Sequence, residues 1–293
     1  MKKDSVIVVY IPHKGNYLEQ FYGLYYSVAH KTKLYEKFDF LVCGPLSIKK
    51  LIPKDHCIFI ELDELSKSDH FRYAYSGNQY GYTDSFAPFV DSKCMDHLLN
   101  YKYCLRLDVD TFLCEGILEV EIKEDEIFTG VAAYSSEFAR KKLPLIMQNL
   151  SLPDQNIPNI GSTWFSTTEN MIRQGARTLD YVNYFLKNEF DKHEGKWPRW
   201  YAGVILLYAG HVAINSSGLK IKKTDKFDYF STSKNDSRDY YTIHCWHTEE
   251  FFSKFSFAAK KYKNRKPISD SYECDEYSFD CAFHGKKILD ENR

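Results

Sequence analysis

The stretch YCLRLDVDTFL, residues 103–113, runs from apolar residues directly into two carboxylates, Asp108 and Asp110. Residues i and i+2 of an extended chain point the same way, so one face carries Arg106, Asp108 and Asp110 and the other carries Leu105, Leu107 and Val109. Two carboxylates held close together lose hydration and repel each other unless a positive charge lies between them. The stretch therefore predicts a buried strand that ends at a divalent cation, and oxygen ligands favour Mg²⁺ or Mn²⁺. The alternative is that the two acids only begin a solvated loop.

The chain before this stretch alternates between strand and helix patterns. Residues 6–11, 38–45 and 57–62 are apolar runs typical of strands that are covered on both faces. Residues 16–30 carry apolar side chains at helical spacing, and a short polar segment with helix potential separates the second and third runs. This order predicts an α/β protein with a mixed, mostly parallel central sheet flanked by helices. In such sheets ligands bind at the carboxyl ends of the strands, where we expect Asp108 and Asp110.

We expect the rest of the chain to complete a single domain, residues 1–293. It is expected to comprise a first half at about 1–115, a second half at about 116–250 and a C-terminal segment, 251–293, that wraps the outside. The further elements predicted from apolar spacing and turn residues are an irregular loop at 71–89, a helix near 91–99, a solvated turn at 119–126, a strand at 127–134 and a long amphipathic helix at 171–190.

Charge and composition exclude several classes of protein. Lys plus Arg (39) nearly balance Asp plus Glu (40), so no overall field favours nucleic acid or an anionic membrane. The Gly-rich fingerprints of dinucleotide oxidoreductases and P-loop kinases do not occur. The eight cysteines are scattered without a C-x-x-C pair, as expected of reduced thiols in a cytosol.

The apolar segments are too short to place the chain in a membrane. The N-terminal apolar run covers only residues 6–12 and lacks a signal-peptide cleavage site, so a first core strand is expected there. The longest other apolar stretch, residues 201–214, is too short to span a bilayer. We therefore expect a cytoplasmic protein without a transmembrane segment.

Two histidines near the C-terminus are the candidate partners of the two carboxylates. The segment YTIHCWHTEEF, residues 241–251, places His244 and His247 after three residues of strand character. We expect one of them, with His244 preferred to His247, to return to the same cleft as a third metal ligand. Zinc is the alternative ion because it takes His and Cys ligands, but the donors of H-C-x-H stand too close together for a standard structural site.

These features together resemble a known family. The segments LRLDVDTFL, NIGSTWF, WPRWYAGVILLYAGHVAIN and IHCWHT are similar to nucleotide-sugar-dependent glycosyltransferases of the GT-A fold, in particular those of large algal viruses, algae and protists. The resemblance covers nearly the whole chain, and it implies that the half at about 1–115 binds the nucleotide and that the half at about 116–250 lies on the acceptor side. It implies a cytoplasmic enzyme, in the host cytoplasm if the chain is viral. Such an enzyme moves a sugar from a nucleoside diphosphate sugar, with a UDP-sugar favoured, to a glycan or other hydroxyl acceptor.

The resemblance also assigns roles on the donor side. In that family the first Asp of D-x-D reaches the ribose or the metal, and the second coordinates the metal that bridges the diphosphate; this implies the same roles for Asp108 and Asp110. The cation, Mn²⁺ or Mg²⁺, stabilises the charge that develops on the leaving diphosphate. The expected donor-binding residues are Tyr10, Pro12, His13, Arg72, Arg106 and Asp108.

Two tryptophan-containing turns, residues 159–166 and 197–203, are expected to bind the sugar or the acceptor. They combine large rings with small polar groups, the mixture that sugar recognition needs, and the alternative is that both are packing corners. The expected contacts are Asn159, Gly161, Ser162, Thr163, Trp164, Trp200 and Tyr201. We favour inversion of the anomeric centre, which needs a carboxylate base; Asp154 is the candidate, and Asp191, Glu194 and Asp228 are the alternatives.

Two other functions stay open at this point. A haloacid-dehalogenase-like phosphatase also uses an apolar strand that ends in D-x-D, but that family normally opens with its motif, whereas about a hundred residues precede Asp108 here. A non-catalytic sugar-binding module would explain the aromatic loops and would have no need for the two carboxylates.

Overall fold

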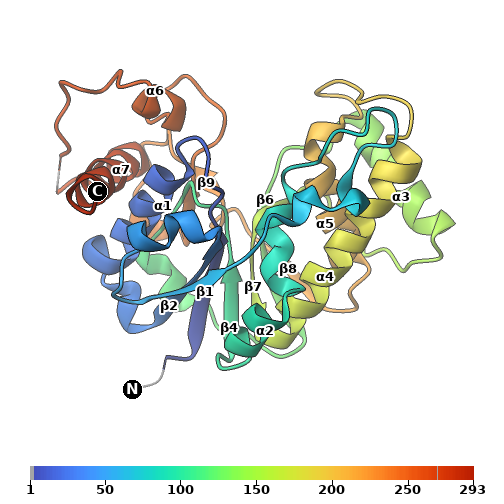
Figure 1. Ribbon diagram of the computed structural model, residues 1–293, viewed down its shortest axis with the longest axis horizontal. Coiled ribbons are helices and arrows are strands. Elements are labelled where there is room, and N and C mark those ends of the chain that lie inside the picture. Colours follow the sequence, from blue (N-terminus) through green and yellow to red (C-terminus); the bar gives the residue numbers. More distant parts are fainter. Residues whose placement is uncertain (1–2, 269) are drawn as a thin grey trace. The chain divides into compact units, whose positions relative to one another are not determined.

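The computed structural model describes residues 3–268 and 270–293. Its contacts form two compact units (Figure 1). The first unit comprises Met1–Glu61, Arg106–Glu121 and Asp225–Arg293, and the second comprises Leu62–Leu105 and Ile122–Thr224. The expected division into a nucleotide-binding half and an acceptor-side half stays a prediction.

The first unit begins with three parallel strands in the order β3-β2-β1. These are β1 (Ser5–Tyr10), β2 (Phe38–Gly44) and β3 (Cys57–Glu61), at the positions expected from the sequence. All six residues of β1 are buried, because its β-branched side chains are covered on both faces. The helix α1 (Tyr17–Tyr26) follows β1, continues through a π turn at Ser27–Lys31, and confirms the expected helix.

A second, three-stranded sheet in the first unit brings distant parts of the chain together. It consists of β5 (Thr111–Leu113), β10 (Thr242–His244) and β9 (Tyr229–Phe230), in the order β5-β10-β9. β10 runs antiparallel to β5, with Ile243 opposite Phe112 and His244 opposite Thr111. This register places His244 beside the residue that directly follows Asp110.

The C-terminal segment, expected to run along the outside, forms a helix with a buried face. This helix, α7 (Cys274–Glu291), packs against α1 (Figure 1). Gly285 permits the close approach, because a Cβ atom there would lie 2.3 Å from the backbone oxygen of Tyr22. The short helix α6 (Lys254–Ala258) precedes α7, and Ser253 caps its N-terminus. The C-terminal residues therefore contribute to the core of the first unit.

The second unit contains the strands β4, β7, β6 and β8 in this order. Their bounds are Tyr103–Arg106 for β4, Glu126–Val131 for β6, Ile160–Thr167 for β7 and Lys220–Lys223 for β8. β6 pairs antiparallel with β7 and parallel with β8. The helices are α2 (Ser92–Leu98), α3 (Glu137–Asn149), α4 (Thr168–Tyr184) and α5 (Ile205–Asn215), and α4 packs against α5.

The seven strands of the larger sheet confirm the expected class, a mixed and mostly parallel sheet flanked by helices. The long helix expected at 171–190 is present, but it begins at Thr168 because the Thr167 hydroxyl caps its N-terminus. Its buried face runs through Gln174, Gly175, Thr178, Leu179 and Val182. In the described part of the chain, no helix has the length and apolar character needed to cross a membrane.

Candidate metal site

The strand that contains the quoted stretch ends earlier than expected. β4 stops at Arg106, and residues 107–110 form a turn before β5 begins at Thr111. The turn is closed by the backbone N–H of Thr111, which donates to the backbone oxygen of Asp108 at 3.2 Å. The backbone N–H of Cys245 donates to the backbone oxygen of Asp110 at 3.0 Å. The turn is therefore also bonded to the segment that follows β10.

Arg106 holds the first carboxylate. Its Nη2 donates to Oδ1 of Asp108 at 2.7 Å, and the Arg106 side chain is buried. The Asp108 side chain remains 34% exposed, whereas that of Asp110 is 9% exposed. The expected proximity of Arg106 to Asp108 is confirmed. One oxygen of Asp108 is thus paired with the Arg106 guanidinium, and the carboxylate remains partly exposed to solvent.

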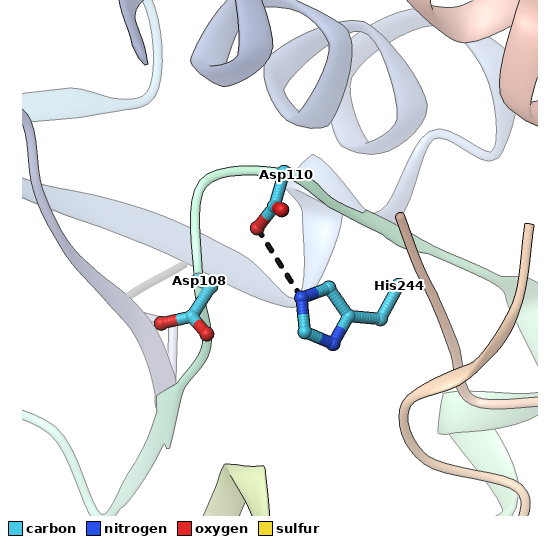
Figure 2. Close-up of side chains that lie close together, drawn as sticks. All are labelled: Asp108, Asp110 and His244. Carbon is cyan, nitrogen blue, oxygen red and sulfur yellow. Dashed lines mark ion pairs between the residues drawn. The ribbon is translucent and has the colours of Figure 1, made fainter. Parts of the chain in front are cut away.

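Asp108, Asp110 and His244 lie close together within the first unit. One potential ligand atom of each lies within 4.8 Å of the others, and in 3–268 and 270–293 no other group of three His, Cys, Asp or Glu residues meets this criterion. Figure 2 shows the two carboxylates on the turn and the His244 ring directed toward them from the neighbouring strand, with Nε2 3.4 Å from Oδ1 of Asp110. Two oxygen donors and one imidazole nitrogen suit a divalent cation such as Mn²⁺ or Mg²⁺.

Asp228 lies on the other side of the His244 ring. Its Oδ1 lies 3.8 Å from Nδ1 of His244, and the residue is only 3% exposed. Asp228 has a left-handed backbone (φ 56°), its N–H donates to Oγ1 of Thr242 at 2.9 Å, and its backbone oxygen accepts from the indole N–H of Trp246 at 3.0 Å. Metal-binding histidines commonly have such a partner, which orients the ring. This placement suits orientation of His244, whereas the sequence had offered Asp228 only as an alternative base.

Lys254 is a site residue that the sequence did not indicate. It begins α6, and its Nζ forms an ion pair with Oδ2 of Asp110, the oxygen of that carboxylate that does not face His244. The Lys254 side chain is 12% exposed. A lysine ten residues after a histidine is a weak pattern by itself, so only the folded chain reveals the contact. Asp110 is consequently shared between a lysine and a histidine.

The charges of this group perturb one another. Burial opposes ionisation of Asp110, but Lys254 and His244 outweigh it and hold the pKa of that carboxyl well below its usual range. Burial opposes protonation of His244, yet Asp110, Asp228 and Asp108 raise its pKa to about 8. Burial also opposes the charge of Lys254, and Asp110 still raises the lysine pKa above its usual value. The arrangement therefore keeps Asp110 ionised.

The other residues expected to bind the donor or the metal lie outside the group of Asp108, Asp110 and His244. His247 is exposed, lies outside the three-residue group, and forms a T-shaped contact with Phe255 at a ring-centroid distance of 5.0 Å. Tyr10 is buried at the end of β1, Pro12 is half-buried and His13 is exposed in the following turn. Their contact with a nucleotide stays a prediction.

Arg72 and Asp154 both belong to the second unit. Arg72 is engaged within its own loop, where Nε pairs with Asp69 at 2.7 Å and Nη1 donates to the oxygen of Gly77 at 3.0 Å. Asp154 is exposed and accepts from the N–H of Asn156 at 2.7 Å. Donor binding by Arg72 and base catalysis by Asp154 stay predictions.

The rings expected to contact sugar are mostly enclosed, which corrects the prediction for two of them. Trp164 is 2% exposed, and its indole N–H donates to the oxygen of Gly161 at 2.9 Å. Trp200 is 9% exposed and is stacked on Phe190 and Tyr208 at centroid distances of 5.4 and 4.3 Å. Trp200 is a packing corner because Phe190 and Tyr208 cover its faces, and the buried Trp164 forms a T-shaped contact with Phe86 at a centroid distance of 5.1 Å.

The remaining residues of the two turns differ in exposure. Thr163 is fully buried and Gly161 is buried, which removes them as direct sugar contacts. Asn159 is half-buried, and its Oδ1 accepts from the N–H of Ser135 at 2.8 Å. Ser162 and Tyr201 are half-buried. Asn159, Ser162 and Tyr201 therefore stay candidates for sugar binding.

The chain shares its fold with the glycosyltransferase LgtC. An active-site mutant of LgtC aligns with a TM-score of 0.52 and 10% identity, over 89% of this chain and 95% of that one. The galactosyltransferase LgtC bound to donor and acceptor sugar analogues aligns at 9% identity over 98% and 95% of the two chains, with a TM-score of 0.46. Mouse xyloside xylosyltransferase 1 in its apo form aligns at 12% identity over 72% and 82%, with a TM-score of 0.41. At these identities the likeness concerns the fold, and it confirms the expected GT-A architecture.

Sequence comparison assigns a family without an activity. A family model described as a domain of unknown function, DUF7164, matches residues 2–292. No curated protein matches the chain. The expected resemblance to members from algae and their viruses stays a prediction.

Proposed function

We propose that this chain, which belongs to the DUF7164 family, is a metal-dependent glycosyltransferase that moves a sugar from a nucleoside diphosphate sugar to a glycan or other hydroxyl acceptor. The observation that carries the proposal is the group formed by Asp108, Asp110 and His244 just beyond the end of β4. Its occurrence in a chain with the fold of LgtC supports sugar transfer rather than another use of a divalent cation.

The chemistry of the group suits the departure of a nucleoside diphosphate. Breaking the bond between sugar and diphosphate leaves negative charge on the phosphate oxygens, and a divalent cation bound here would stabilise that charge as a Lewis acid. Asp108, Asp110 and His244 would hold this Mn²⁺ or Mg²⁺ ion. Arg106 keeps the Asp108 carboxylate in position, and the ammonium of Lys254 adds a second positive charge beside Asp110.

The finer assignments form part of the same proposal. We favour a UDP-sugar as the donor, with a hexose or a pentose as the transferred unit. Tyr10, Pro12, His13, Arg72 and Arg106 are the proposed contacts of the nucleotide. For the reaction we favour inversion, with Asp154 as the base near the acceptor hydroxyl.

Binding of nucleotide sugars with and without Mn²⁺ tests the proposal. We expect UDP and at least one of UDP-glucose, UDP-galactose and UDP-xylose to raise the melting temperature in the presence of Mn²⁺, and we expect the sugar nucleotide to be hydrolysed slowly to UDP. Asp110→Asn should abolish the Mn²⁺ dependence because it removes the buried ligand charge. Asp55→Asn, at an exposed carboxylate of the first unit, is the matched control and should behave as the wild type.

Other outcomes separate the competing functions. A stronger response to GDP-mannose or CMP-sialic acid would replace the UDP-sugar assignment and keep the transferase. Phosphate release from an aryl phosphate, lost in Asp108→Asn, would favour a phosphatase. If no nucleotide sugar binds in a Mn²⁺-dependent way, the proposed transferase activity is wrong.

A further inference from the structure

Two loops of the second unit present tyrosine side chains and one carboxylate at the surface. The first loop, residues 71–82, carries Tyr73, Tyr75 and Tyr82; the second, residues 194–203, carries Glu194 and Tyr201. Tyr75 and Tyr82 are 37% and 57% exposed, which is unusual for large rings in loops that are otherwise tightly bonded. None of these side chains belongs to the metal group.

The first loop is a rigid hairpin. Arg72 and Gln79 form an antiparallel bridge, the N–H of Tyr73 donates to Asn78 at 2.8 Å, and the N–H of Tyr80 donates to Phe71 at 2.8 Å. Gly77, with φ 69°, allows the reversal at the tip. The ring of Tyr73 contacts those of Tyr75 and Tyr80 at centroid distances of 5.3 and 5.9 Å. Each exposed ring thus lies against a neighbouring ring, Tyr75 against Tyr73 and Tyr82 against Tyr80 at a centroid distance of 5.4 Å.

The second loop is equally constrained. Gly195 and Tyr201 form an antiparallel bridge, and the N–H of Ala202 donates to the oxygen of Glu194 at 2.8 Å. The ring of Tyr201 lies over Gly203, where a Cβ atom would stand 2.3 Å from the ring. The buried Tyr80 ties the first loop to α5, the helix that follows the second loop, because its hydroxyl accepts from the N–H of Leu206 at 2.8 Å.

The polar ends of these side chains converge. Glu194 lies beside the hydroxyl of Tyr201. Burial raises the pKa of Tyr201, and the charges of Glu194, Tyr82 and Tyr75 raise it further. Burial raises the pKa of Tyr73, and Tyr75, Glu194, Tyr201 and Tyr82 raise it further. Each of the four hydroxyls can both donate and accept, and the carboxylate accepts. The surface thus combines flat rings with a cluster of hydrogen-bonding groups.

We infer that this tyrosine surface, formed by Tyr73, Tyr75, Tyr82, Glu194 and Tyr201, binds neutral sugar residues of a glycan. A pyranose offers an apolar C–H face that packs on an aromatic ring and a rim of hydroxyls that bond to polar groups, and the surface supplies both. Fixed tyrosines lose little conformational freedom on binding, which favours affinity. Binding of the glycan by this surface does not depend on the proposed transferase function. Its identification as the acceptor rests on that function.

A quaternary ammonium ligand fits the surface less well. Such a cation needs ring faces around it and makes no use of hydroxyl donors. Here Tyr73 and Tyr201 each interact electrostatically with Glu194 and with Tyr75 and Tyr82. The convergence of donors and acceptors therefore favours a polyhydroxylated ligand.

Saturation-transfer NMR with neutral tetrasaccharides, without nucleotide or metal, tests this inference. The probes are cellotetraose, maltotetraose, xylotetraose and mannotetraose, with choline as the cationic probe. We expect saturation of ring C–H protons in at least one sugar, and calorimetry should give an affinity for that sugar that falls roughly tenfold or more in the double variant Tyr75→Ala, Tyr82→Ala. These two rings are exposed, so their removal should leave the fold intact.

Two further variants make the result specific. Tyr272→Ala removes a tyrosine of the first unit that is 46% exposed and should leave sugar binding unchanged. Gly203→Ala should weaken sugar binding without removing any contact group, because the new methyl group displaces the Tyr201 ring. Absence of binding by all four sugars, equal binding by the double variant, or a response to choline alone would overturn the inference. None of these results affects Mn²⁺-dependent binding of a UDP-sugar, so the two proposals fail separately.

Discussion

Nδ1 of His244 lies 3.8 Å from Oδ1 of Asp228, a carboxylate whose backbone is held by Thr242 and Trp246. We expect this buried acid to orient the ring, whose other nitrogen faces Asp110. Asp228→Asn removes the charge and keeps a side chain that tolerates the left-handed backbone. We expect Mn²⁺ affinity, measured by calorimetry, to fall about 10- to 100-fold. Asp225→Asn, at an exposed carboxylate three residues earlier, is the control, and an equal affinity in the two variants would show that Asp228 does not position the ligand.

The ion pair between Lys254 and Asp110 predicts a link between stability and metal binding. Lys254→Met leaves a buried carboxylate with less compensation, so we expect the metal-free protein to lose about 3–5 kcal/mol in the free energy of unfolding by urea. Mn²⁺ should restore much of this loss and should raise the melting temperature more than in the wild type. Lys261→Met removes an exposed pair with Glu249 and should cost no more than about 1 kcal/mol. Similar losses in the two variants would contradict this account.

His211 predicts a loss of stability in acid. Burial lowers its pKa to about 4, only partly offset by Asp154, and Nδ1 lies 3.0 Å from the hydroxyl of Tyr134. Because the unfolded chain takes up a proton near pH 6.5 and the folded chain only near pH 4, this contribution is present above pH 6.5. The contribution is lost as the pH falls from about 6.5 to about 4, and it amounts to at most about 3 kcal/mol of unfolding free energy.

The acid dependence can be assigned by substitution. In His211→Gln the slope of unfolding free energy against pH between about 6.5 and 4 should decrease by the equivalent of roughly one proton. His13→Gln, at an exposed histidine, should keep the wild-type slope. Acidic groups such as Asp110 titrate in all three proteins and cancel in the comparison. A wild-type slope in His211→Gln would show that this histidine is not the source.

The close contact between α1 and α7 predicts that replacing Gly285 by a larger residue destabilises the fold. A Cβ atom at position 285 would lie 2.3 Å from the oxygen of Tyr22 and 2.6 Å from the nitrogen of Gly23, so the helices would have to separate. We expect Gly285→Ala to cost about 1–3 kcal/mol in unfolding free energy, although alanine favours a helix by roughly 1 kcal/mol. At Gly210 the added atom meets the Trp164 ring at 2.9 Å, and a side chain yields more readily than a backbone. An equal cost in Gly210→Ala would contradict this explanation.

Local pattern was enough to predict most elements of the fold. The apolar runs at β1, β2 and β3 and the helical spacing after β1 depend on neighbours in the sequence, so the α/β order and the parallel sheet followed from them. The end of β4 was misplaced because alternation of side chains does not show where a turn begins. The same limitation affected Trp164 and Trp200, since composition does not distinguish a ring that binds sugar from one covered by Phe190 and Tyr208.

By itself, the sequence determined that two carboxylates follow a buried strand and that a histidine near the C-terminus is their candidate partner. Only the tertiary structure decided which groups surround them. Lys254 is separated from Asp110 by 144 positions, and Asp228 reaches His244 through the pairing of β9 with β10. Such contacts depend on the register of paired strands and on the burial of charge, and neither can be inferred from the spacing of residues along one chain.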